Sequence, residues 1–251
     1  MSYLDVRNLS FSFDHTQPIL RDVSFSIEKG SLTVLTGRNG SGKTVLLKCL
    51  KGLYPISAGS IAVEGNKYEK ARKERNRRFA LVFQEAESQI VGQTVYKDIE
   101  FGLENLEIPK SLRKETIDST ARLMRIKHLL GRRPQTLSGG ELRRLAIAGV
   151  LAMAPQILML DEPFANLDAD GITDILQVLV HMKAQGHTIL VVTHELEKIL
   201  AHADRLVVMD RGTVVIEEAP SIAVCSVEQF GVHRPRCSCG YLPVEEMTWL
   251  T

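Results

Sequence analysis

A glycine-rich octapeptide constrains the fold of this 251-residue chain more than any other feature of its sequence. It reads Gly37-Arg-Asn-Gly-Ser-Gly-Lys43-Thr44 and fits the pattern G-x-x-x-x-G-K-[ST] in full. The β-branched apolar run before it, residues 32–36, predicts a buried parallel strand, and an apolar helix is predicted from about 44 to 53. Glycines let several backbone N–H groups point at one phosphate, and the helix N-terminus adds its positive dipole end. The octapeptide therefore predicts a nucleoside triphosphate site, with the Lys43 ammonium near the β- and γ-phosphates and the Thr44 hydroxyl on Mg²⁺.

Two carboxylates stand where another apolar strand is expected to end. The run 157–160 is apolar and leads directly into Asp161 and Glu162. Ligands of parallel sheets bind at the carboxyl ends of the strands, so both side chains are candidates for the triphosphate site. We expect Asp161 to hold Mg²⁺, directly or through water, and Glu162 to polarise an attacking water as a general base. The alternative, two acids at a solvated turn, is weakened by the phosphate loop upstream.

Strands and helices alternate through most of the chain, which predicts an α/β fold with a mostly parallel sheet covered on both faces. Alternating runs near the N-terminus predict additional strands, and residues 85–133 have a helical pattern. Helices are also expected at 138–154, 172–184 and 195–202, and a hairpin around 210–212. From Pro220 onward no clear periodicity remains, which predicts a loosely specified tail.

Charge and hydropathy exclude several function classes. The formal net charge is +1, so the chain lacks the strong field of a non-specific nucleic-acid binder, and the basic stretch 67–78 is interpreted as a solvated surface. The longest apolar stretch, 146–160, is interrupted and too short to cross a bilayer. No signal peptide is recognised at the N-terminus. We therefore expect a cytosolic protein unless a partner holds it at a membrane.

The cysteine content does not support a disulfide scaffold. The chain has four cysteines, Cys49, Cys225, Cys237 and Cys239. Cys49 lies in an apolar helical stretch and is expected to be a small buried hydrophobe. His233 lies near Cys237 and Cys239, but a metal site there is only weakly favoured because no fourth ligand has a recognisable spacing.

A second glycine-rich helix start indicates that two chains, and not one, form the nucleotide site. In Leu137-Ser-Gly-Gly-Glu141, Ser138 is a helix cap and the glycines expose N–H groups, which predicts a second anion-binding site. One chain does not need two such sites for one phosphate tail, but two chains facing each other do. With this motif in place, the sequence resembles the ATP-binding-cassette (ABC) ATPases over roughly residues 3–218.

This resemblance implies a P-loop NTPase fold with a RecA-like parallel sheet core, an antiparallel β subdomain and an inserted α-helical subdomain. The ATPase domain would be residues 1–218, the helical subdomain about 85–147, and 219–251 a C-terminal tail of unknown role. In the family, two cassettes bind two ATP molecules head to tail, each between the phosphate loop of one chain and the signature motif of the other. Closure of this dimer and ATP hydrolysis then drive movement of an attached membrane protein.

The resemblance also assigns residues. Those implied at the nucleotide are Phe13, Gly37, Arg38, Asn39, Gly40, Ser41, Gly42, Lys43, Thr44, Val45, Ser138, Gly139, Gly140 and Glu141. Those implied in catalysis are Glu162, the switch histidine His194 and the Q-loop residue Gln84, and the implied Mg²⁺ ligands are Thr44, Gln84 and Asp161.

Some of these positions carry alternatives or departures from the family pattern. Phe13 is the expected adenine-stacking residue, and Phe11 competes for that role. Val45 replaces the usual Ser or Thr and loses a hydroxyl contact to the α-phosphate, and Glu141 replaces the usual Gln. Ala165-Asn replaces Ser-Gly in the D-loop and leaves Asp168 in place. No catalytic group is lost, so an active ATPase is expected.

The residues after Gln84 narrow the class of cassette. A second glutamine (Gln89), a Thr-Val pair at Thr94, an acid (Asp98) and Phe101-Gly resemble the energy-coupling-factor and cobalt-type importer ATPases. The expected partners are a second ABC ATPase subunit, identical or paralogous, and integral membrane subunits, with no nucleic acid. The expected location is the cytoplasmic face of the cell membrane, as a peripheral protein, and the cargo a vitamin or a nickel or cobalt ion. Another ABC importer or exporter ATPase, or a soluble regulatory ABC ATPase, remains an alternative.

Overall fold

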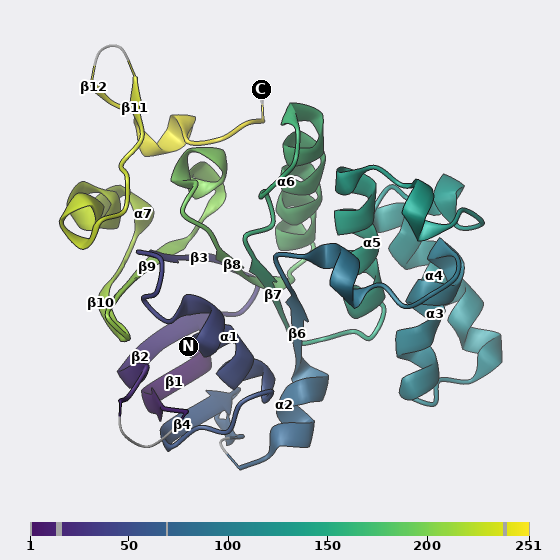
Figure 1. Ribbon diagram of the computed structural model, residues 1–251, viewed down its shortest axis with the longest axis horizontal. Helices are drawn as coiled ribbons and strands as arrows, with labels where there is room; N and C mark the ends of the chain where they lie inside the picture. Colours follow the sequence, from purple (N-terminus) through teal and green to yellow (C-terminus); the bar gives the residue numbers. More distant parts are fainter. Residues whose placement is uncertain (1, 14–16, 69, 238–239, 251) are drawn as a thin grey trace.

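A computed structural model describes residues 2–13, 17–68, 70–237 and 240–250 of the chain (Figure 1). Its central sheet has the strand order β10-β9-β3-β8-β7-β6. The strands are β3 (Leu32–Gly37), β6 (Phe79–Val82), β7 (Ile157–Asp161), β8 (Thr188–Val192), β9 (Arg205–Asp210) and β10 (Thr213–Glu218). All neighbours pair in parallel except β10, which runs antiparallel to β9. Every residue of β3, β6, β7 and β8 is buried, as apolar runs in a sheet covered on both faces require. The predicted parallel core is confirmed.

Alternate residues of these strands belong to two different cores. Leu35 and Val192 face a core that contains helix α1 (Lys43–Lys51) and a second, antiparallel sheet. That sheet has the order β2-β1-β4-β5, with β1 (Ser2–Phe11), β2 (Leu20–Glu28), β4 (Ala58–Val63) and β5 (Asn66–Lys67). Val34 and Val191 face the other core, which includes helix α6 (Ala169–Ala184). The two-fold side-chain period of a strand thus places α1 and α6 on opposite faces of the central sheet.

The middle of the chain is helical and lies beside β6, at the right of Figure 1. It contains α3 (Val95–Asn105), α4 (Lys110–Leu123) and α5 (Gly139–Leu151), preceded by a short 3-10 helix, η1 (Ala86–Gln89). Short 3-10 helices at Lys127–Leu129 and Pro134–Thr136 connect α4 to α5. A further helix, α2 (Arg72–Arg78), comes before β6. The fold class predicted from the sequence is confirmed.

Three of the residues that resemble the energy-coupling-factor type, Gln89, Thr94 and Asp98, have a structural role. The Gln89 side chain accepts from Phe83 N at 2.7 Å and donates to Leu81 O at 3.0 Å, which fixes the end of β6. Thr94 caps α3 by accepting from Lys97 N. The buried Asp98 carboxylate accepts from the N–H groups of residues 91 and 92. The Gln89 bonds connect the sheet to the helical part of the chain, and the Thr94 and Asp98 bonds fix the start of α3.

Two expectations for the last third of the chain are wrong. Residues 195–202 form two short 3-10 helices, Leu196–Lys198 and Leu200–His202, instead of one α-helix, because Ile199 between them has φ −137°. The chain beyond Pro220 is not loosely specified: it contains α7 (Pro220–Ala223), the 3-10 helices η6 (Val224–Phe230) and η7 (Val244–Glu246), and the strand pair β11 (Arg236–Cys237) and β12 (Gly240–Tyr241). Its elements are too short for a periodic pattern, but Val227 and Met247 are fully buried in the core of the α6 face. Across the described ranges, no helix is long and apolar enough to cross a membrane.

Candidate functional site

The glycine-rich loop connects the end of β3 to the start of α1, as predicted. Gly42 occupies the N-cap position with φ 100°, and no described side chain caps the helix, so its first-turn N–H groups are available to a ligand. Gly37 is required by close approach, because a Cβ atom there would lie 2.1 Å from the carbonyl oxygen of Met209. Around Gly40, no described atom would lie within 4 Å of an added Cβ. The loop is therefore open on one side and closely packed on the other, which fits an anion site.

Lys43 is held in place without a ligand. Its ammonium donates to Gly37 O at 2.7 Å and to Arg38 O at 3.0 Å. The side chain is 8% exposed, and burial lowers the pKa of Lys43, while the charges of Glu162 and Asp161 oppose that shift. The positive charge is thus positioned by the carbonyl groups of the loop itself, with two carboxylates nearby.

Thr44 and Asp161 meet across the carboxyl end of the sheet. The Thr44 hydroxyl donates to Asp161 Oδ2 at 2.8 Å. Burial raises the pKa of Asp161, and the bond from Thr44 acts in the opposite direction. A hydroxyl and a carboxylate oxygen in contact at the edge of a cleft are the hard oxygen ligands that Mg²⁺ prefers, so this pair fits a magnesium ion.

These groups face one cleft of about 430 Å³. The cleft is lined by Ile19, Asn39, Gly40, Gly42, Lys43, Thr44, Val45, Gln84, Asp161 and Glu162. Three residues of the octapeptide, and also Phe13, are absent from its wall, although the sequence placed them on the nucleotide. Gly37 is the buried last residue of β3, and the exposed Arg38 side chain donates to Phe230 O. Ser41 is buried, with its carbonyl accepting from Gly212 N. Ile19 was not predicted, and no signal in the sequence marks it.

Glu162 and His194 form a hydrogen-bonded pair. His194 Nδ1 lies 2.9 Å from Glu162 Oε1, although 32 residues separate them in the chain. The Glu162 N–H donates to Val192 O, and the residue has a left-handed φ of 47°, a conformation that non-glycine residues rarely adopt. Its second oxygen, Oε2, is buried and has no hydrogen-bond partner among the described residues. This arrangement leaves one oxygen of a cleft-lining carboxylate without a hydrogen bond.

The signature motif lies at a different cleft. Ser138 caps α5 in a capping box: its hydroxyl accepts from Glu141 N, and Glu141 Oε2 accepts from Ser138 N at 2.7 Å. The Ser138 N–H bond lowers the pKa of Glu141. Glutamate can therefore replace glutamine here because the position needs an acceptor. Ser138, Gly139 and Gly140 line a cleft of about 330 Å³ that shares no residue with the phosphate-loop cleft. Within one chain, the structure does not bring the two motifs together.

The aromatic candidates separate by burial. Phe13 is 63% exposed and Phe11 only 4%. Phe11 stacks on Tyr54 with ring centroids 5.2 Å apart, and Phe13 meets both rings edge-on. Of the two phenylalanines, Phe13 is the one with a large exposed surface for a base, and Tyr54 is a supporting residue that sequence reasoning missed.

Arg143 was also missed. This residue of α5 is 5% exposed, and it donates to Phe83 O, the carbonyl immediately before Gln84, at 2.9 Å. A second nitrogen lies 3.5 Å from Ala165 O in the D-loop. Burial lowers the pKa of Arg143. One guanidinium thus links the signature helix to the Q-loop. Its neighbour Arg144 is buried too, and the sequence gave no sign of which of the two arginines would make this link.

The cysteine expectations are partly testable. Cys49 is fully buried, and burial raises the pKa of its thiol to about 12, as expected of an inert core cysteine. The metal site considered at His233, Cys237 and Cys239 falls partly outside the described residues, which include neither Cys239 nor the side chain of Cys237. In the part of the chain that the structure describes, no group of three or more His, Cys, Asp or Glu side chains could hold a metal ion.

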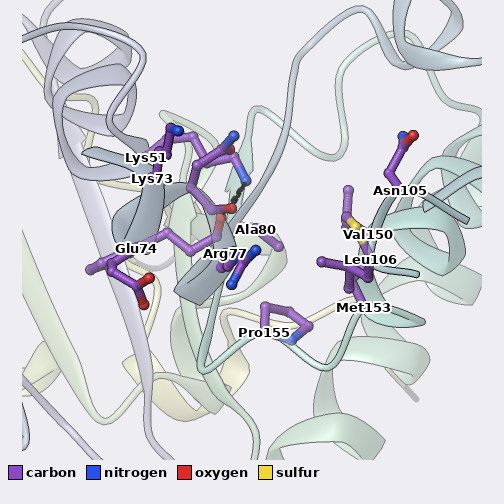
Figure 2. Close-up of a pocket in the computed structure, with 12 residues that line it drawn as sticks. Lys51, Lys73, Glu74, Arg77, Ala80, Asn105, Leu106, Val150, Met153 and Pro155 are labelled. Carbon is purple, nitrogen blue, oxygen red and sulfur yellow. Dashed lines mark hydrogen bonds between the residues drawn. The ribbon is translucent and has the colours of Figure 1, made fainter. Parts of the chain in front are cut away.

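A groove of about 430 Å³ lies at the opposite end of the sheet strands, between α2 and the helical part of the chain (Figure 2). Lys51 and Lys73 stand on one side, and the apolar side chains of Leu106, Val150 and Met153 on the other. Lys51 Nζ donates to Asn76 O and Phe79 O, both at 2.6 Å. Burial lowers the pKa of Lys51 from its ordinary value of 10.5 to about 8.

The lowered pKa of Lys51 predicts a pH-dependent stability. Between pH 8 and 10.5 the unfolded chain binds a proton at Lys51 that the folded chain has lost, so stability rises with pH in this window. A shift of this size corresponds to ~3 kcal/mol across the window. Urea unfolding of the wild type and of Lys51→Met should be measured at pH 7.5 and 10. From the lower to the higher pH, the free energy of unfolding of the wild type should increase relative to that of the variant. Parallel pH profiles of the two proteins would contradict the assignment.

Comparison with known proteins assigns a class to this arrangement. The sequence profile of the ABC transporter family matches residues 20–165. The energy-coupling factor transporter ATP-binding protein EcfA of Carboxydothermus hydrogenoformans is 37% identical over 235 residues, 92% of this chain and 87% of that protein. EcfA1 of Oceanobacillus iheyensis is 38% identical over 221 residues, 87% of this chain and 79% of that protein. The structure of CbiO1 from Clostridium perfringens, part of the ABC transporter complex CbiONQ, has a TM-score of 0.83 at 31% identity and covers 91% of this chain and 92% of that one.

The chain therefore belongs to the ABC transporter family, in which it is an ATP-binding subunit that hydrolyses ATP. Within that family it belongs with the energy-coupling factor transporter ATP-binding proteins. The family predicted from the phosphate loop, the signature motif and the residues after Gln84 is confirmed.

Proposed function

We propose that this chain powers substrate import at the cytoplasmic face of the cell membrane, as one of two ABC ATPase subunits bound to integral membrane subunits. The observation that carries the proposal is the separation of the two anion sites. The phosphate loop and the signature motif line different clefts of one chain. The glycine-rich starts of α1 and α5 each offer backbone N–H groups to an anion. A second subunit that faces the first would therefore give each ATP a phosphate loop from one chain and a signature motif from the other.

In this proposal the chain's own groups divide the work of hydrolysis. The loop N–H groups and Lys43 bind the phosphates, and Phe13 receives the base. Mg²⁺, held by Thr44 and Asp161 with Gln84 on the same cleft wall, would neutralise charge on the phosphates. Glu162 Oε2 accepts a proton from the attacking water, and His194 holds the carboxylate through Oε1.

The second subunit completes the site. Ser138 already accepts from Glu141 N, so its hydroxyl proton is free to donate to a phosphate oxygen across the interface. Gly139 and Gly140 add N–H groups at the start of α5. We propose that either a second copy or a paralogue can supply this surface, because the capping box is local to residues 138–141.

We propose the groove in Figure 2 as the docking place of a membrane subunit. It separates the sheet core from the helical part, about 85–147, so a segment seated there contacts both units of the proposed ATPase domain 1–218. Phe101 is 48% exposed and lies one helical turn before the lining residue Asn105 on α3. Leu53 is 41% exposed and follows α1. These two exposed apolar side chains, on or just after elements that contribute residues to the groove, favour an apolar segment of a partner.

The relatives support a proposal for the class of cargo. One solved neighbour is part of a CbiONQ transporter complex, and the curated relatives are energy-coupling factor proteins. We propose a vitamin or a nickel or cobalt ion as the transported substrate. No residue of the phosphate-loop cleft selects it, because that cleft is built for a triphosphate.

Affinity purification from gently solubilised native membranes tests this function. The wild-type chain should bring down a second ABC ATPase, a small integral coupling protein and a substrate-binding membrane protein. Phe101→Glu is the matched variant: it should still bind ATP but lose the membrane proteins. The isolated complex should show ATPase activity that responds to its vitamin or metal. Recovery of the wild type only from the soluble fraction would contradict the transport function and favour a soluble regulatory ATPase.

A further inference from the structure

The C-terminal segment, defined as residues 220–237 and 240–250, touches the phosphate loop. The 3-10 helix η6 ends at Phe230, and Gly231 follows with φ 70°. Carbonyl groups at a helix end lack partners within the helix, and arginine side chains commonly satisfy them. Here the partner is Arg38 of the octapeptide, whose Nε donates to Phe230 O at 3.0 Å across 192 residues of sequence.

This contact is close enough to depend on a glycine. A Cβ atom at Gly231 would lie 2.0 Å from Arg38 Nε and 2.8 Å from both Cδ and Cζ. No side chain at position 231 is compatible with the observed place of Arg38. The Arg38 side chain therefore lies against bare backbone, between the phosphate loop and the end of η6.

The C-terminal segment is itself firmly attached. Val224 and Val227 are buried in the core of the α6 face. At its other end Met247 is fully buried, and its carbonyl accepts from Ala201 N at 3.0 Å. His202 Nε2 lies 2.7 Å from the hydroxyl of Thr248. Phe230 thus belongs to a segment anchored on both sides, so its carbonyl is a fixed point for Arg38.

Arg38 connects this fixed point to the phosphate-binding lysine. Its side chain is bound by the C-terminal segment, and its carbonyl accepts from the Lys43 ammonium. A loop that is held in its binding geometry before the ligand arrives loses less conformational freedom on binding.

We propose that the C-terminal segment holds the phosphate loop in its nucleotide-binding conformation through the Phe230–Arg38 contact, and that Arg38 is a positioning residue. Holding the phosphate loop is a role for the C-terminal segment that the sequence did not indicate. The inference depends on the proposed function only in that the phosphate loop is the ATP site. It does not depend on a membrane partner, so it is tested with the isolated chain.

Gly231→Ala, Arg38→Ala and the double variant test the proposal with ADP, which is not hydrolysed, as the probe. Each single variant should weaken ADP binding ~3- to 10-fold because the loop must then be ordered by the ligand. The double variant should be no weaker than Arg38→Ala, since both changes remove the same contact.

Gly65→Ala is the matched control for backbone strain. Gly65 has a similar φ of 77°, and no described atom lies within 4 Å of its Cβ position. This variant should carry the same strain and bind ADP as the wild type does. Arg38→Lys, which can still donate to the carbonyl, should restore most of the affinity that Arg38→Ala loses.

Hydrogen exchange of the free protein shows whether Arg38 positions the loop or only contacts the nucleotide. This measurement needs no variant at Gly231. In Arg38→Ala without ligand, the amides of residues 38–44 should exchange faster than in the wild type. Unchanged exchange there would overturn the proposal, as would wild-type ADP affinity in a folded Gly231→Ala. The proposal would also be overturned if the losses of ADP affinity in the two single variants multiplied in the double variant, because the two losses would then have independent causes.

Discussion

Glu162→Gln is expected to lower ATP turnover by ~10²- to 10⁴-fold, the usual contribution of a positioned general base. The amide keeps the size of the side chain and can still bond His194 Nδ1, but it cannot accept a proton from water. Glu162 lines the cleft, and its Oε2 has no hydrogen-bond partner among the described residues, so the change removes the acceptor that the proposed mechanism uses. Steady-state phosphate release at saturating ATP measures the effect.

ATP binding should survive this change, because the phosphates are held by the loop and by Lys43. The Glu162→Gln chain should therefore form a stable dimer on addition of Mg-ATP, detectable by light scattering. His194→Ala is the companion variant: it keeps the carboxylate but removes the group that bonds Oε1 at 2.9 Å. It should lower kcat more than it raises KM. Wild-type turnover by Glu162→Gln would remove the general-base role, and an unchanged kcat in His194→Ala would remove the positioning role.

Local motifs made much of this site predictable. A strand, a glycine-rich loop and a helix follow one another within the chain, so the position of Lys43 and Thr44 could be stated from sequence. The Ser138 cap was predictable for the same reason, because a capping box spans four residues. The parallel sheet then brings Asp161 to Thr44 across 117 residues, and the rule that parallel strands present their carboxyl ends together predicted that meeting.

Contacts without a local pattern were not predictable. The bond of Arg38 to a backbone carbonyl in the C-terminal segment depends on no side chain that sequence could mark. The same holds for the segment as a whole: its buried valines and Met247 come from short elements, and no period of 2 or 3.6 residues can develop over so few positions. Residues 195–202 lost their predicted helix at Ile199, and Met247 O takes up the Ala201 N–H instead. Tertiary contacts overrode local propensity in each case.

Lys43→Ala is expected to weaken binding of both ADP and ATP by ~30- to 1000-fold, or about 2–4 kcal/mol, because a desolvated charge contact to phosphate is lost. In the free protein the ammonium is 8% exposed and bonded to Gly37 O and Arg38 O. The defect should therefore appear in the dissociation constant measured by titration calorimetry, before any catalytic step.

The fold should tolerate this loss better than the ligand does. Burial lowers the pKa of Lys43, which means that the folded chain pays a desolvation penalty for its charge. Removing the ammonium relieves that penalty, while the two loop carbonyls remain at a cleft that water can enter. The Tm without nucleotide should thus stay near that of the wild type, and the rise in Tm on adding ADP should disappear. Lys43→Arg keeps the charge, but a planar guanidinium replaces the compact ammonium that donates to both Gly37 O and Arg38 O, so it should bind ADP poorly as well. If Lys43→Ala binds ADP as tightly as the wild type, the loop N–H groups alone hold the phosphates.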